Sequence, residues 1–164
     1  MLSYDFKQAI SCVSRELNQQ NLAYALIGSA NLALQGMDLS PKDLDLVMQI
    51  NDLKKAPKIF KKYHASPVEE LRSDSNDPAW TAKLKNHPAW DVHFNIEKIP
   101  VQILGEPQNG EYVSKLISKK LVYILVSGVN IPCFTLEAEA YVHKETFRFE
   151  KAERIVSFLK TRKA

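Results

Sequence analysis

The chain has 164 residues, of which 45% are hydrophobic and 25% charged, and its formal net charge is +3. This is the balance of a globular protein, and the length suits a single domain, residues 1–164, rather than two independent cores. The small positive charge permits an anionic substrate but is too low for the basic surface that is typical of nucleic-acid-binding proteins.

Membrane insertion and secretion are not expected from the sequence. No apolar run approaches the ~20 residues of a transmembrane helix, and the first residues lack the apolar core of a signal peptide. Cys12 and Cys133 stand alone in apolar surroundings without metal-binding or disulfide spacing, as expected for reduced thiols. We therefore expect a cytoplasmic protein that does not associate with membranes.

The first half of the chain is predicted to alternate helices and strands. Phe6, Ile10 and Val13 recur at helical spacing, which predicts an opening helix. Ser29 is suited to cap a short helix that Gly36 would close. The elements expected here are helix 4–20, strand 22–27, helix 30–36, strand 42–48, helix 51–63 and strand 66–71.

The second half is predicted to carry two hairpins and a helical end. Apolar residues alternate with polar ones from Asp91 to Glu97, which predicts a half-buried strand. The elements expected here are a helix opening at Asp77-Pro78, strands 91–97 and 101–104, helix 111–119, strands 121–127 and 131–134, and a C-terminal helical segment 135–164 capped by Thr135. Together these elements predict an α/β (α+β) fold, with a mixed β-sheet and helices packed on one side.

Asp43 and Asp45 carry the clearest chemical signal. Carboxylates at positions i and i+2 of a strand point to the same side, roughly 6–7 Å apart along the backbone. Neighbouring acids repel each other and are costly to bury, whereas Mg²⁺ binds carboxylate oxygens together with substrate phosphates. A Gly28-Ser29 turn beside this strand would offer backbone N–H groups to the same phosphates. The combination predicts phosphoryl or nucleotidyl transfer.

The order of these motifs resembles the nucleotidyltransferase superfamily. Residues 24–34 (YALIGSANLAL), followed by Asp43-Leu44-Asp45, are similar to its strand, Gly-Ser turn, helix and Asp-x-Asp strand. The catalytic core of DNA polymerase beta typifies this superfamily, and the chain looks most like its small prokaryotic members, near the aminoglycoside and toxin–antitoxin nucleotidyltransferases. The element order agrees along the whole chain, but the specific motifs lie only within residues 24–48. An edge-strand acidic pair beside an unrelated helix start remains the alternative.

The resemblance implies a role for each motif residue. Gly28 and Ser29 would contact the triphosphate of a nucleoside triphosphate (NTP) such as ATP. Asp43 and Asp45 would be the catalytic residues and would bind Mg²⁺ or Mn²⁺.

Basic residues on late helices often lean toward the phosphates in this superfamily, and Lys144 and Arg148 match that placement loosely. The resemblance would make them nucleotide-binding residues. Basic residues in the last turn of a helix also stabilise its dipole without any ligand, so both interpretations stay open.

A third carboxylate is expected on a neighbouring strand in active members, and here the chain departs from the pattern. Gln102 occupies that position, and an amide carries no charge and cannot act as a base near neutral pH. A hairpin turning about Lys98-Ile99 would place Asn95 opposite Gln102 and Glu97 diagonally beside it. His93 and Glu97 are therefore candidates to complete the site, unless the polar side of this strand is simply the solvated outer face of the sheet.

The leading hypothesis is a nucleotidyltransferase that passes a nucleoside monophosphate to a hydroxyl group on a small molecule, protein or RNA. The alternative is a nucleotide-binding or partner-binding module of the same fold that has lost catalysis, which Gln102 favours. A plain nucleic-acid-binding domain ranks last, because the lysines of 54–62 have few aromatic neighbours. A chain of this size leaves the acceptor side of the cleft open, and a homodimer or partner subunit could close it.

Overall fold

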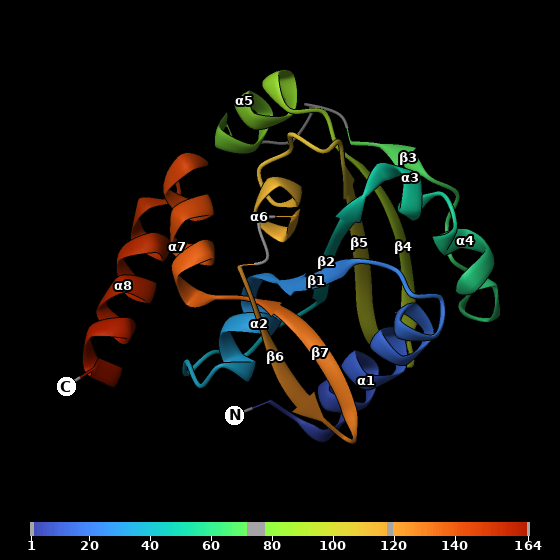
Figure 1. Cartoon of the computed structure of the whole chain (residues 1–164), viewed down its shortest axis with the longest axis horizontal. Coiled ribbons are helices and arrows are strands. Elements are labelled where there is room, and N and C mark those ends of the chain that lie inside the picture. Colours follow the sequence, from blue (N-terminus) through green and yellow to red (C-terminus); the bar gives the residue numbers. More distant parts are fainter. Residues whose placement is uncertain (1, 72–77, 118–119, 164) are drawn as a thin grey trace.

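A seven-stranded mixed β-sheet forms the centre of the structure (Figure 1). The computed structural model describes residues 2–71, 78–117 and 120–163. Its strands are β1 (Tyr24–Ile27), β2 (Leu44–Gln49), β3 (Glu69–Glu70), β4 (Trp90–Ile96), β5 (Ile99–Glu106), β6 (Leu121–Val126) and β7 (Val129–Phe134). They follow the order β3-β4-β5-β2-β1-β7-β6, in which β2–β5 and β1–β7 are parallel pairs and the other neighbours are antiparallel.

Helices connect these strands, and two more follow the last strand. Those of the described residues are α1 (Tyr4–Gln19), α2 (Gly28–Leu34), α3 (Ile50–Leu53), α4 (Ala56–Ile59), α5 (Pro78–Asn86), α6 (Val113–Ile117), α7 (Leu136–Glu145) and α8 (Phe149–Lys163), with a 3₁₀ turn at Lys61–Tyr63. Among the described residues, no helix combines the length and the hydropathy that a membrane crossing requires.

Helices cover both faces of the sheet. Leu46 of β2 packs into a core that includes residues of α1, α3 and α4, whereas the adjacent Val47 packs on the opposite face with residues of α6 and α7. Consecutive side chains of a strand point to opposite faces, so a strand buried on both sides needs a helix layer on each. Figure 1 shows α6, α7 and α8 on one side of the sheet and α1, α3 and α4 on the other. The predicted mixed α/β sheet is confirmed, but its helices do not lie on one side only.

Several predicted elements are shorter or differently bounded in the structure. The helix expected over 51–63 is divided into α3, α4 and the 3₁₀ turn, with Pro57 in the first turn of α4. Proline has no N–H to donate, so it begins a helix readily and interrupts one that is already running. Thr135 caps α7 as expected, since its Oγ1 accepts a hydrogen bond from Ala138 N–H at 3.1 Å.

Ser29 does not cap α2, because that helix begins at Gly28 and Ile27 stands at its cap position without a side-chain bond. The Asp77 cap and the end of the helix expected at 111–119 fall on residues 72–77 and 118–119, which lie outside the described residues.

Candidate functional site

The Gly28-Ser29 turn lies directly beside Asp45. β1 and β2 are antiparallel with Ile27 opposite Asp45, so the chain leaves β1 next to this carboxylate. Gly28 has a φ of +71°, and a Cβ built there would stand 2.9 Å from Oδ2 of Asp45. Both the backbone angle and the close approach therefore require glycine. Ser29 follows as the second residue of α2 and is half-buried.

Asp43 and Asp45 form an electrostatically unfavourable pair. Asp45 lies half-buried on β2, and Asp43 is exposed just before that strand. Burial and the neighbouring charge of Asp43 raise the pKa of Asp45 to about 6. Burial penalises the charged form and a like charge adds to that penalty, so the position favours an added positive charge.

Two basic residues at the start of α8 act electrostatically on Asp45. Lys151 and Arg148 both act to lower the pKa of Asp45, against the larger effect of burial. Arg148 is half-buried just before α8, and Lys151 lies in the first turn of that helix. Lys144 is exposed on α7, and no described contact connects it with Asp45. Of the two predicted basic residues, the structure thus brings Arg148 to the acidic pair, and it adds Lys151.

The hairpin register differs from the expected one. His93, not Asn95, lies opposite Gln102, because Glu97 and Lys98 form the turn and Ile99 already belongs to β5. Glu97 stands in that turn, beyond the last strand pair Ile96–Ile99, and therefore does not lie opposite or diagonal to Gln102. Glu97 is thus not brought to Gln102, whereas His93 is.

Gln102 itself lies beside Asp45 on the adjacent parallel strand. Nε2 of its side-chain amide donates a hydrogen bond to Oδ2 of Asp91 at 2.7 Å. A row of polar side chains therefore crosses three strands, from Asp45 on β2 through Gln102 on β5 to Asp91 on β4.

A cavity of about 640 Å³ opens beside this row. Asp43, Gln102 and His93 line it on one side. The other lining residues are Lys62, Tyr63, His64, Phe94, Asn95, Pro100 and Val101. The cavity places mixed polar and aromatic groups next to the exposed Asp43.

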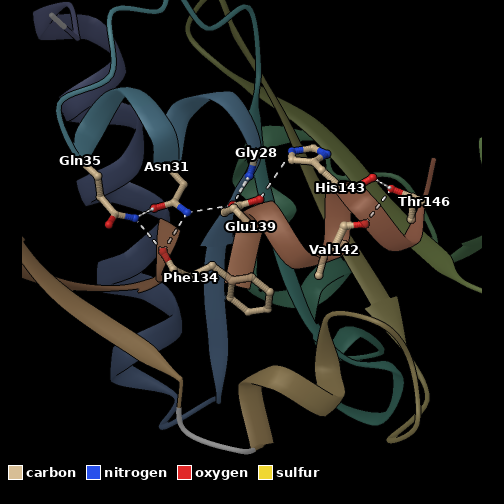
Figure 2. Close-up of polar contacts among 8 residues, drawn as sticks. All are labelled: Gly28, Asn31, Gln35, Phe134, Glu139, Val142, His143 and Thr146. Atoms are coloured by element: carbon tan, nitrogen blue, oxygen red, sulfur yellow. Dashed lines mark hydrogen bonds and ion pairs between the residues drawn. The ribbon is translucent and has the colours of Figure 1, made fainter. Parts of the chain in front are cut away.

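A buried glutamate of α7, Glu139, contacts the Gly28-Ser29 turn (Figure 2). Oε1 of Glu139, on α7, accepts hydrogen bonds from Gly28 N–H and from Asn31 Nδ2, both at 2.8 Å. Nε2 of His143 lies 3.8 Å from Oε2 of the same carboxylate. Glu139 and His143 are fully buried or nearly so, at 0% and 2% exposure. Burial raises the pKa of Glu139 to about 7, although the two hydrogen bonds act to lower it.

Sequence reasoning missed Glu139, Asp91 and Lys151 as parts of this region. In the sequence, Glu139 looks like an ordinary acidic residue in the first turn of a helix, where acids are common. Its spacing of four residues from His143 was the one local signal that pointed to a paired role. The sequence placed Asp91 only on the polar side of strand 91–97 and Lys151 only among the basic residues of the C-terminal segment. Their proximity to Gln102 and Asp45 depends on strand register and on the docking of α8.

Comparison with known proteins decides the family. The family model of aminoglycoside-2''-adenylyltransferase matches residues 9–155 of this chain. The chain belongs to this family. Membership of the aminoglycoside-2''-adenylyltransferase family and of the wider nucleotidyltransferase superfamily points to nucleotidyl transfer as its chemistry. A comparison with curated proteins finds no significant match.

Two solved structures share this fold over nearly the whole chain. A candidate nucleotidyltransferase from Thermotoga maritima superposes with a TM-score of 0.68 at 20% identity, covering 98% of this chain and 96% of that one. An antigenic nucleotidyltransferase-like protein from Paracoccidioides brasiliensis gives a TM-score of 0.51 at 12% identity, with 98% and 89% covered. At these identities the likeness establishes the fold of this aminoglycoside-2''-adenylyltransferase family member and nothing further about its substrates.

Proposed function

We propose that the protein is a metal-dependent nucleotidyltransferase, which transfers a nucleoside monophosphate from an NTP such as ATP to a hydroxyl group of an acceptor. The observation that carries this proposal is the close approach of Gly28 to Asp45, with Asp43 beside it and the charges of Arg148 and Lys151 acting on the same carboxylate. Acidic ligands, a small-residue turn and basic side chains are the groups that an NTP with its divalent cation requires.

Asp43 and Asp45 are the residues that would hold Mg²⁺ or Mn²⁺. Carboxylate oxygens are the ligands that these hard cations prefer, and the pKa of Asp45 is raised by burial and by the charge of Asp43, both of which a bound cation would offset. When bound, the cation supplies positive charge to the phosphoryl oxygens.

The phosphates would contact Ser29, Arg148 and Lys151. Gly28 N–H already donates to Glu139, so the turn would contribute through Ser29 while Gly28 allows close approach to Asp45. Arg148 would bind phosphate oxygens through its planar fork of donors, and Lys151 would add a point charge. Lys144 would contribute through its charge at most, because it is exposed and unconnected with Asp45 by any described contact.

The acceptor would bind in the cavity beside Asp43. Asn95 offers an amide and Tyr63 an aromatic surface to a hydroxylated molecule there, beside Lys62, whose ammonium group pairs with Glu16. The family description makes an aminoglycoside the first acceptor to test, ahead of a protein or RNA hydroxyl. A homodimer or partner subunit that covers the open side of this cavity remains part of the proposal.

Pyrophosphate release tests the proposal directly. The protein is incubated with each NTP, Mg²⁺ and a panel of aminoglycosides and other hydroxyl acceptors. Asp43→Asn and Asp45→Asn should each abolish metal-dependent turnover while the protein stays folded. Asp52→Asn is the matched control, because Asp52 follows the opposite end of β2 and pairs with Lys55 at 2.9 Å. Turnover retained in the Asp43→Asn/Asp45→Asn double variant would refute the assignment.

A second function is favoured by Gln102. Its amide donates to Asp91 and offers no base beside Asp45, which suits a module that binds a nucleotide or a partner without transferring a nucleotidyl group. Calorimetry with Mg²⁺ and a non-hydrolysable ATP analogue separates the two functions. Binding without pyrophosphate release under any acceptor would support the second, and acceptor-dependent release by the unaltered protein would exclude it.

A further inference from the structure

Three side chains that commonly bind metals meet at the β3 edge of the sheet, beyond Gln102. Glu69 of β3 lies directly opposite Asp91 of β4, and His93 follows Asp91 by two residues, so it points to the same face. One ligand atom from each of Glu69, Asp91 and His93 lies within 4.8 Å of the other two. We call these three residues the β3–β4 cluster.

Asp91 is the fixed member of the β3–β4 cluster. Its residue is only 7% exposed, although it is an acid near the edge of a sheet. Oδ2 accepts the hydrogen bond from Gln102 Nε2 at 2.7 Å, and it lies 4.0 Å from Nδ1 of His93. A carboxylate oriented by a neighbouring amide is the arrangement found where an outer partner fixes a metal ligand.

The β3–β4 cluster holds two carboxylates that face each other across neighbouring strands. Acids directly opposite each other on antiparallel strands repel, and the pairing of Glu69 with Asp91 is such a case. Among the described residues, no lysine or arginine forms a salt bridge with either carboxylate. A divalent cation bound between the two carboxylates would replace their repulsion with attraction to the cation.

We propose that Glu69, Asp91 and His93 form a divalent-cation site that is separate from Asp43 and Asp45. Two carboxylate oxygens and one imidazole nitrogen favour Mn²⁺, Co²⁺ or Zn²⁺ over Mg²⁺. Three protein ligands leave coordination positions for water or for a group of a bound molecule. Metal–ligand bonds of about 2.0–2.2 Å require the ligand atoms to approach one another more closely, which the exposed side chains of Glu69 and His93 can do by rotation.

The position of His93 connects this cation site with the cavity. His93 lines the same cavity as Asp43 and Gln102, so a cation held by the β3–β4 cluster stands at the cavity wall. An oxygen atom of a molecule bound in the cavity then lies within reach of an open coordination position. The site binds its cation in the absence of nucleotide, which separates its test from the test of catalysis.

Cobalt titration of the metal-stripped protein tests the proposal. Visible absorption of Co²⁺ and calorimetry with Zn²⁺ are recorded without nucleotide for the unaltered protein and its variants. We expect one tight site, a loss of at least 10-fold in affinity for His93→Ala and for Glu69→Gln, and unchanged binding for Asp43→Asn/Asp45→Asn. Glu69 and His93 are exposed, so their substitution should leave the unfolding midpoint unaltered.

His87→Ala is the matched control. His87 Nε2 pairs with Glu111 at 3.4 Å and takes no part in the β3–β4 cluster, so its loss should leave Co²⁺ affinity unchanged. The proposal is overturned if His93→Ala binds Co²⁺ as the unaltered protein does, or if Asp43→Asn/Asp45→Asn removes the binding.

Discussion

Substituting Gly28 by alanine tests whether this glycine positions Asp45, because the variant should lose a little folding stability and much more activity. Alanine at a φ of +71° costs about 1–2 kcal/mol relative to glycine. The new Cβ would also stand 2.9 Å from Oδ2 of Asp45, about half an ångström closer than ordinary van der Waals contact. Since that oxygen ends a side chain, the carboxylate can rotate away at little cost to folding.

Gly128→Ala is the control for the backbone term. Gly128 has a φ of +77° with no atom within 4 Å of the added Cβ, so it shares the strain without the contact. We expect both variants to lose about 1–2 kcal/mol in urea unfolding. A displaced metal ligand should lower Mg²⁺-dependent pyrophosphate release about 100-fold in Gly28→Ala alone. Equal activity of the two variants would refute the inference that Gly28 positions Asp45.

Three further predictions concern charge. The pKa of Glu139 rises from its ordinary 4.5 to about 7, so the folded protein loses stability as pH increases between these values. Glu139→Gln should remove this loss, which is on the order of 3 kcal/mol. Urea unfolding of both proteins at pH 5 and pH 8 measures it, and the same stability difference between them at both pH values would contradict the prediction. Lys151→Met removes a charge that lowers the pKa of Asp45, so the acid limit of Mg²⁺ binding with a non-hydrolysable ATP analogue, expected near pH 6, should move upward. An unmoved midpoint in a pH series counts against this prediction. Gln102→Asp replaces the 2.7 Å hydrogen bond to Asp91 with a like-charge contact that costs roughly 1–4 kcal/mol without metal, and added Mn²⁺ should restore the thermal midpoint if a cation binds there.

Local sequence patterns predicted most of the fold because they report contacts close in sequence. The helical spacing of Phe6 and Ile10 gave α1 almost to its ends, and the alternation along 91–97 gave β4. Errors arose where one residue decides a boundary. Pro57 divided the helix expected over 51–63, and the use of Glu97-Lys98 as the turn moved His93 into the place expected for Asn95.

The candidate site was predictable in its acidic pair and turn but not in its surroundings. Asp43, Asp45 and Gly28 lie within one strand–helix–strand unit, and the expected proximity of Gly28 to Asp45 appears in the structure. The contact between Gly28 and Glu139 joins residues 111 positions apart, so no local pattern can reveal it. The partners of Gln102 likewise depend on a strand register that spacing alone did not fix. The catalytic, nucleotide-binding and metal-binding roles of all these residues stay predictions.

The hydrogen bond between Gly28 and Glu139 also determines when the turn can be held by α7 during synthesis, because the chain is made from its N-terminus. The turn and both acidic residues leave the ribosome before α7, which follows β7 and brings Glu139 about a hundred residues later. Until α7 docks, the N–H of Gly28 and the amide of Asn31 have no carboxylate to hold them. The Glu139 contacts that hold the turn beside Asp45 therefore form only after α7 has been made, so chains that stop before Glu139 carry the acidic pair without these contacts.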